Sequence, residues 1–143
     1  MLTSIKSPGG VSRSFYWDSY GRITNRIDKI PGGTTFSNSC TYDNKGRLST
    51  ITHPSAIVET RNYNSNGYLS SISANGVVKY TISSMNAFQQ VVSVFYGSGL
   101  DGTSTSFGYD NYGYPTQTVT TKQDGTKIQD YSYNFDPVKG ILN

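Results

Sequence analysis

The sequence predicts an all-β fold: a curved, meandering antiparallel sheet of tandem β-hairpins with no substantial helix. A short unit, Tyr-Asp-x-x-Gly, recurs along the chain at intervals of 19 to 27 residues. Recurrence at such intervals is typical of repeat architectures. Helix formers are scarce, with one Glu and three Ala among 143 residues, whereas Tyr, Ser, Thr and Gly are abundant. Side chains alternate around each unit as in strands, so we expect roughly ten to twelve short strands.

The motif Tyr-Asp-Asn-Lys-Gly-Arg-Leu gives the clearest hairpin. Asp43 suits the first position of a type I turn because its carboxylate accepts backbone N–H bonds, and Gly46 suits the left-handed conformation that follows. With a bulge at the glycine, Tyr42 should lie opposite Leu48, and Asp43 opposite Arg47 on the other face. We therefore expect one aromatic and aliphatic face and a second face that begins with an Asp/Arg pair.

Copies of this unit are expected in order at 17–23, 42–48, 63–69, 82–88, 109–115 and from 135 onward. In the worn copy at 82–88, Ser83 takes the acidic position and Asn86 the glycine position, because Asn tolerates the left-handed conformation. Ile82 is then predicted to pair with Phe88. The acidic positions are 25, 21, 19, 27 and 26 residues apart, which indicates variable loops around a fixed hairpin.

A structural role in the repeat is assigned to the residues at the motif positions. They are Trp17, Asp18, Gly21, Arg22, Tyr42, Asp43, Gly46, Arg47, Leu48, Tyr63, Asn64, Gly67, Leu69, Tyr109, Asp110, Gly113, Phe135 and Asp136. The recurrence of Leu48 with Ile51 leaves two possibilities, because a three-residue step changes faces in a regular strand. Either each second strand carries a bulge, or both faces of the sheet are partly covered.

The tandem motifs at 42–48 and 17–23, with weaker copies at 63–69, 109–115 and 135–142, resemble the YD-repeat or RHS-repeat family. This family includes bacterial Rhs proteins, toxin-complex C subunits and the teneurins. The resemblance implies a β-sheet strip that spirals into a hollow shell around a toxin or an unfolded polypeptide, in a secreted or cell-surface context. It also implies carbohydrate binding in some members. Neither the family's associated-core segment nor a variable toxin domain is found in this sequence.

The chain is expected to be one array segment, residues 1–143, of about five to six repeats that starts and ends in the middle of a repeat. Residues 2–8 match the second half of a hairpin, and residues 136–142 follow the start of another. We therefore expect a piece of a longer array. Its partners would be neighbouring repeats of a parent protein, or other copies that associate through the open ends of the sheet.

A search for reactive groups predicts no catalytic, cofactor-binding or metal-binding residues, and hence no enzyme. His53, the single histidine, has no further His and no Cys cluster with which to form a zinc site. Cys40 is alone, and its alternation with Tyr42 favours a small buried apolar residue. Asp136 before Pro137 resembles the self-cleavage sites of related shells, but a lone carboxylate lacks an acid–base partner.

Charge and hydropathy exclude two classes of partner. The formal net charge is +3, and no dense basic stripe is present, so nucleic acid is not expected. No apolar run is long enough to span a bilayer. No signal peptide precedes the first repeat, so export would be encoded elsewhere in a parent protein.

Two functions remain as hypotheses. The first is a non-catalytic segment of a β-sheet shell or cell-surface scaffold that encloses or presents another polypeptide. Its wall would be lined by Tyr42, Tyr63, Tyr80 and Tyr109. The alternative is a carbohydrate-binding or adhesion module in which exposed aromatic rings stack on glycans. Its candidate residues are Tyr20, Tyr68, Tyr112 and Tyr114.

Overall fold

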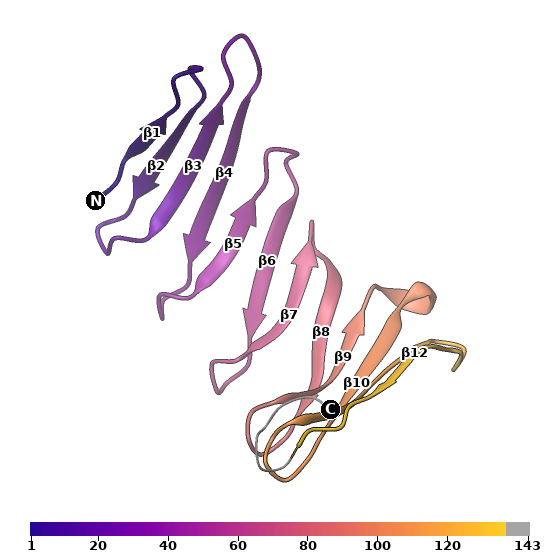
Figure 1. Cartoon of the computed structure of the whole chain (residues 1–143). Helices are drawn as coiled ribbons and strands as arrows, with labels where there is room; N and C mark the ends of the chain where they lie inside the picture. Colours follow the sequence, from indigo (N-terminus) through magenta and orange to yellow (C-terminus); the bar gives the residue numbers. More distant parts are fainter. Residues whose placement is uncertain (137–143) are drawn as a thin grey trace. The chain divides into compact units, whose positions relative to one another are not determined.

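The structure, a computed structural model, describes residues 1–136 and consists of β-strands joined by tight turns (Figure 1). The strands are β1 (Ser4–Lys6), β2 (Ser12–Trp17), β3 (Ile23–Lys29), β4 (Thr35–Tyr42), β5 (Leu48–Thr52), β6 (Val58–Tyr63), β7 (Leu69–Ala74), β8 (Val77–Met85), β9 (Val91–Tyr96), β10 (Thr103–Tyr109), β11 (Pro115–Lys122) and β12 (Lys127–Ser132). Within residues 1–136, the single helical element is a 3-10 turn, η1 (Gly99–Asp101). The predicted all-β fold is confirmed.

The strand order is that of a meander, from β1 to β12. The chain divides into two compact units. Unit 1 comprises residues 1–62 and 73–76, and unit 2 comprises residues 63–72 and those from 77 onward. The pairs β1–β2 to β5–β6 and β8–β9 to β11–β12 are antiparallel. We number the hairpins by their strands: first β2–β3, second β4–β5, third β6–β7, fourth β8–β9 and fifth β10–β11.

The register of the second hairpin decides between the two possibilities left open by the sequence. Tyr42 pairs with Leu48 as predicted, but Cys40 pairs with Ile51, so Ser49 is an extra residue in β5. This bulge brings Leu48 and Ile51 to the same face of the sheet. Each second strand of the first, second and fifth hairpins carries such a bulge.

The predicted pairs of the first and fifth hairpins are also confirmed. Trp17 lies opposite Ile23, and Tyr109 lies opposite Pro115. The aromatic residue before each turn therefore shares a face with the first apolar residue after it.

The predicted turn register of the fourth hairpin is wrong. Asn86, expected at the glycine position, occupies the acidic position that was assigned to Ser83. Gln89 occupies the glycine position, with a φ of 66°. Asn is favoured at both positions of this turn, so the residue type alone did not choose between them. With Asn86 in place, the first residues of the five described turns are 25, 21, 22 and 24 residues apart, a more even spacing than predicted.

The pairing of the fourth hairpin changes accordingly. Ile82 lies opposite Val94 and not, as predicted, opposite Phe88. Met85 and Val91 instead form the pair that flanks the turn. Val91 and Val94, three residues apart, are thus the counterparts of Leu48 and Ile51 in the second hairpin.

The two faces of unit 1 differ in chemistry. One face, which we call the ring face, carries Phe15, Trp17, Tyr42, Leu48 and Ile51. The opposite face carries mainly hydroxyl and amide groups, among them Asn25, Ser37, Ser39, Thr41 and Thr50. Neighbouring side chains on this polar face pair with each other, as in the 2.7 Å contact between the Thr41 and Thr50 hydroxyls.

Little of the chain is fully buried. Among the residues whose burial the structure describes, Val94 is the single fully buried hydrophobic residue, with 2% of its surface exposed. The chain exposes 9520 Å² of surface, whereas a compact monomer of 15.7 kDa exposes about 7300 Å². The strands thus form a sheet whose apolar groups are mostly half-buried, because no second layer covers them.

Residues 97–102 connect β9 to β10 and contain η1. Gly102 is buried here against Phe95, and an added Cβ atom would lie 2.0 Å from the ring. Only glycine fits this close approach.

Candidate functional site

Four hydrogen bonds build the tip of the first hairpin around Asp18. Its Oδ1 atom accepts from the backbone N–H groups of Tyr20 (2.9 Å) and Arg22 (3.0 Å). Its own N–H donates to the Arg22 carbonyl (2.9 Å), and the Gly21 N–H donates to the Asp18 carbonyl (3.1 Å). The Arg22 guanidinium then returns to Oδ2, with Nε and Nη2 each 2.7 Å away. The carboxylate thus orders the whole turn.

The same four-bond arrangement recurs at the other hairpin tips. In residues 1–136 it begins at Asp18, Asp43, Asn64, Asn86 and Asp110. The fourth residue of each turn is left-handed, with φ angles of 78°, 80°, 89°, 66° and 86° in that order. Asn replaces Asp without loss of these bonds because its amide oxygen is also an acceptor.

The two Asp/Arg tips of unit 1 hold their carboxyls ionised. The pKa of Asp18 lies below its usual value of 3.8, chiefly because the Arg22 backbone N–H donates to it. Partial burial acts to raise the pKa of Asp43, but hydrogen bonds from the Arg47 side chain and backbone outweigh it, so this pKa is lowered as well. Hydrogen bonds to the charged form favour ionisation.

Aromatic donors link successive hairpins. The Tyr42 hydroxyl donates to the Ile23 carbonyl at 2.8 Å. In unit 2, the Tyr109 hydroxyl donates to the Val91 carbonyl at 2.9 Å. At these two hairpins the residue before the turn thus binds the return strand of the preceding hairpin, a role that sequence reasoning missed.

Trp17 makes the corresponding bond at the start of unit 1. Its indole Nε1 donates to the Leu2 carbonyl at 3.1 Å. The signal available in the sequence was that Trp17, Tyr42 and Tyr109 all carry a side-chain donor, which Phe lacks.

The side chain after the glycine position makes a second contact between hairpins. The Arg22 guanidinium carbon lies 4.2 Å from the centre of the Tyr42 ring and 5.0 Å from that of Tyr20, which are cation–π distances. In unit 2, Gln90 Nε2 donates to the Gly113 carbonyl at 2.8 Å. Arg22 and Gln90, at equivalent positions of their turns, thus each contact the next hairpin.

Tyr114, proposed from the sequence as a glycan platform, packs against another ring. It stacks on Phe135, with ring centres 5.3 Å apart and an interplanar angle of 20°. Tyr20 and Tyr112, at the same position of two different tips, are 82% and 80% exposed. Of the four tyrosines, Tyr112 and Tyr114 share one tip and Tyr20 belongs to the other unit.

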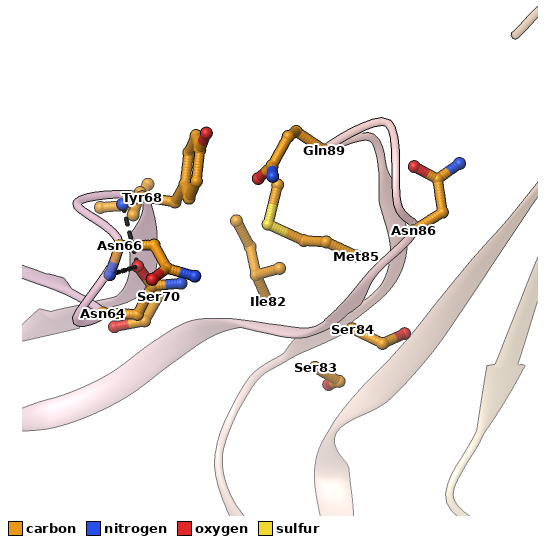
Figure 2. A pocket seen from close by; sticks show the side chains of 11 residues that line it. Asn64, Asn66, Tyr68, Ser70, Ile82, Ser83, Ser84, Met85, Asn86 and Gln89 are labelled. Carbon is orange, nitrogen blue, oxygen red and sulfur yellow. Dashed lines mark hydrogen bonds between the residues drawn. The ribbon is translucent and has the colours of Figure 1, made fainter.

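The fourth tyrosine, Tyr68, lines a groove of about 310 Å³ within unit 2, between the tips of the third and fourth hairpins. Figure 2 shows Tyr68 and Gln89 on two sides of the groove, with Ile82 and Met85 between them. Asn66 lies beside Tyr68. The groove therefore combines a ring, an aliphatic floor and side-chain amides.

A wider hollow of about 600 Å³ lies on the ring face of unit 1. Phe15, Cys40, Tyr42 and Ile51 contribute to it, together with His53. Cys40 is half-buried and unoxidised, opposite Ile51. The hollow offers apolar contact area beside polar groups.

Half-buried ion pairs border the apolar part of the ring face. Arg13 Nε donates to Asp28 Oδ1, and Arg26 Nε lies 3.2 Å from Asp28 Oδ2. The hydrogen bond from Arg13 lowers the pKa of Asp28. These charges on the ring face were not foreseen from the sequence, because their strand positions could not be aligned without the register.

A second group of charges lies at the turn that contains His53. Arg61 Nε lies 2.8 Å from Glu59 Oε1, and His53 Nε2 lies 3.7 Å from Glu59 Oε2. No group of three His, Cys, Asp or Glu side chains that could hold a metal ion occurs in residues 1–136. The same residues contain no helix long and apolar enough to cross a membrane. Pro137, of the Asp-Pro pair, lies outside the described residues.

Solved structures of Tc toxin complexes share this fold. A crystal structure of TcdB2-TccC3-Cdc42 matches 92% of this chain with a TM-score of 0.73 and 16% sequence identity. A structure of TcdB2-TccC3 matches 91% of it with a TM-score of 0.74 and 17% identity. A Tc holotoxin pore of Photorhabdus luminescens matches 99% of it with a TM-score of 0.63 and 12% identity.

This chain spans 7% of the length of the first two matched chains and 10% of the third. No family model and no curated protein matches the sequence. At these identities the similarity establishes the fold, and the predicted likeness to toxin-complex shells is confirmed at that level.

Proposed function

We propose that this chain is a non-catalytic segment of a YD-repeat β-sheet shell or cell-surface scaffold that encloses or presents another polypeptide. The observation that carries the proposal is a repeated hairpin sheet without a covering layer, in which Val94 is the single fully buried hydrophobic residue among those whose burial the structure describes. Likeness to the Tc toxin fold supports a role as part of a shell wall. A wall that encloses a polypeptide needs a sheet face that no other layer of the same chain covers. In this proposal the parent protein is secreted or exposed at the cell surface.

The ring face suits a polypeptide occupant. Phe15, Tyr42 and Ile51 offer apolar contact around a hollow of about 600 Å³. The nearby Asp28 and Glu59 carboxylates are already paired with arginines, so the face presents little uncompensated charge. An unfolded chain presents both apolar side chains and backbone amides. The ring face has apolar side chains and polar groups that can contact both.

The partners follow from the open edge of the sheet. All three residues of β1 are exposed, and β1 has a neighbour on one side only. An unpaired edge strand accepts another strand, so we propose pairing with neighbouring repeats of a parent protein or with a second copy. Sedimentation should then reveal association that rises with protein concentration.

The test of the shell proposal is binding of an unfolded polypeptide by the full chain. The probe is a fluorescent protein fragment kept unfolded by reduction and alkylation, and anisotropy reports its binding. Phe36→Ser alters a ring-face side chain that is 39% exposed, and Tyr16→Ser alters one on the opposite face that is 52% exposed. We expect Phe36→Ser to weaken binding and Tyr16→Ser to leave it unchanged. Absence of binding, or equal loss in both variants, would contradict the proposal.

A second candidate function is carbohydrate binding or adhesion through exposed rings. It is favoured by the exposure of Tyr20 (82%) and Tyr112 (80%), which lie at equivalent positions of two tips. Rings left in water at a repeated position can stack on the apolar faces of sugars. A glycan array probed with the full chain and with a Tyr20→Ala/Tyr112→Ala variant tests it. Loss of a saturable signal in the variant is expected.

A further inference from the structure

The groove between the third and fourth hairpin tips contains a left-handed turn residue that is not glycine. The turn position occupied by Gln89 is glycine at the other four tips described above. Gln89 is left-handed there, with a φ of 66°. A side chain at such a position carries a conformational cost that glycine avoids, and strain of this kind concentrates at functional positions. The Gln89 side chain lines the groove.

Two amides at the groove are available to a ligand. Within residues 1–136, the side-chain amides of Asn66 and Gln89 make no hydrogen bond to protein, and both residues are exposed. Asn86 differs, because its Nδ2 atom donates to Gln90 Oε1 at 2.9 Å and its Oδ1 atom caps the turn. Figure 2 shows the Asn86 side chain directed away from Gln89. Each free amide offers a donor and an acceptor.

The remaining walls define the class of ligand. No charged residue lines the groove. Tyr68 supplies a ring, while Ile82 and Met85 supply an apolar floor (Figure 2). A ligand with one apolar face and a polar, uncharged edge would match these groups, and a sugar ring has both.

We propose that this groove binds a neutral glycan, with one sugar ring against Tyr68 and its hydroxyl groups paired with the amides of Gln89 and Asn66. The groove volume, about 310 Å³, lies at the lower end of the range for ligand pockets and suits a short sugar segment. The inference rests on the second candidate function, but it assigns the binding to a bounded site instead of the exposed tips.

The experiment uses the full chain and an array of neutral glycans ending in glucose, galactose, mannose or N-acetylglucosamine. Gln89→Gly removes the amide and relieves the strained turn, so it should fold at least as well as the wild type. We expect it to weaken binding about tenfold, the effect of losing one or two hydrogen bonds. Tyr68→Ala should weaken binding by a similar or larger factor. Tyr131→Ala, at a tyrosine that is 56% exposed and lies outside the groove, is the control and should leave it unchanged. Tyr112→Ala is measured beside it to report on the exposed tips.

Nuclear magnetic resonance locates the ligand independently. On addition of the best neutral glycan from the array, the side-chain amide signals of Asn66 and Gln89 should shift, and that of Asn86 should not. Absence of saturable binding to any neutral glycan, or binding only to sialylated or sulfated ones, would overturn the inference. Binding lost in Tyr112→Ala but kept in Gln89→Gly would overturn the groove and leave the exposed-ring function standing.

Discussion

The hairpin tips at Asp43 and Asn86 have the same backbone conformation, but their side chains make different contacts. Both close with the same four hydrogen bonds to the first turn residue. The Asp43 tip has Gly46 at its left-handed position, whereas the Asn86 tip has Gln89. The comparison teaches that an acceptor side chain and one left-handed residue define the turn. The remaining turn positions are free for contacts with a neighbour or with a ligand.

The largest effect is expected from giving the Asp43 tip the residue of the other tip, by Gly46→Gln. Gly46 has a φ of 80°, and an added Cβ atom would lie 3.2 Å from Arg22 Nη1. Left-handed strain and displacement of the Arg22 guanidinium should together lower the free energy of unfolding by about 1–2 kcal/mol. Urea denaturation measures the change. Gly32→Gln, at a left-handed turn with no atom within 4 Å of an added Cβ, separates strain from contact.

Removal of the hydroxyl that joins two hairpins should have the next largest effect. Tyr42→Phe loses the bond to the Ile23 carbonyl, and Tyr109→Phe loses its counterpart in unit 2. We expect each to cost about 1 kcal/mol, because a partly buried carbonyl is left without this donor. Tyr20→Phe, at an 82% exposed position, is the control and should change stability by less than about 0.5 kcal/mol. Equal effects at all three positions would contradict the linking role.

The reverse exchange, Gln89→Gly, should be mildly stabilising. Relief of a φ of 66° outweighs the greater freedom that glycine gives the unfolded chain, by about 0.5–1 kcal/mol. Thermal unfolding of Gln89→Gly and of Gly46→Gln, each compared with the wild type, measures the stability change for removing and for adding a side chain at this turn position. A loss of stability in Gln89→Gly would mean that the Gln89 side chain supports the fold.

The smallest effect concerns pH. The pKa of Asp43 is lowered in the folded state from its usual 3.8, so its stabilising contribution is complete above that value and is lost as pH falls through the folded pKa. Asn86 does not titrate. Between about pH 6 and about pH 3, Asp43→Asn should therefore lose less stability than the wild type, and Asn86→Asp should lose more. Asp28, Asp124 and Asp130, whose pKa values are also lowered, contribute a background common to all variants.

Local turn chemistry explains why much of the fold could be predicted. Asp18, Asp43 and Asp110 each precede a glycine by three residues, and this spacing fixed the position of the turn and of the flanking pairs. The sequence could not decide between a bulge and a sheet covered on both faces. It shows the three-residue step from Leu48 to Ile51, but it does not show which residues of the partner strand lie opposite them.

The fourth hairpin shows where local chemistry is ambiguous. Asn86 fits either the acceptor position or the left-handed position of the turn. The prediction placed it at the left-handed position, whereas in the structure it occupies the acceptor position. The groove beside this tip depends on Gln89 and Tyr68, which are 21 residues apart and become neighbours of one cavity only through the register of the sheet. That part of the candidate site could not be read from spacing within one repeat.

The bonds from Trp17, Tyr42 and Tyr109 end on main-chain oxygen atoms. Every residue type supplies such an atom, so the acceptor does not depend on which amino acid stands in the preceding hairpin. If one repeat is duplicated, deleted or moved, each repeat therefore still finds a main-chain carbonyl acceptor in the hairpin that precedes it. Such an array can lengthen by copying without a matched change in the unit beside it.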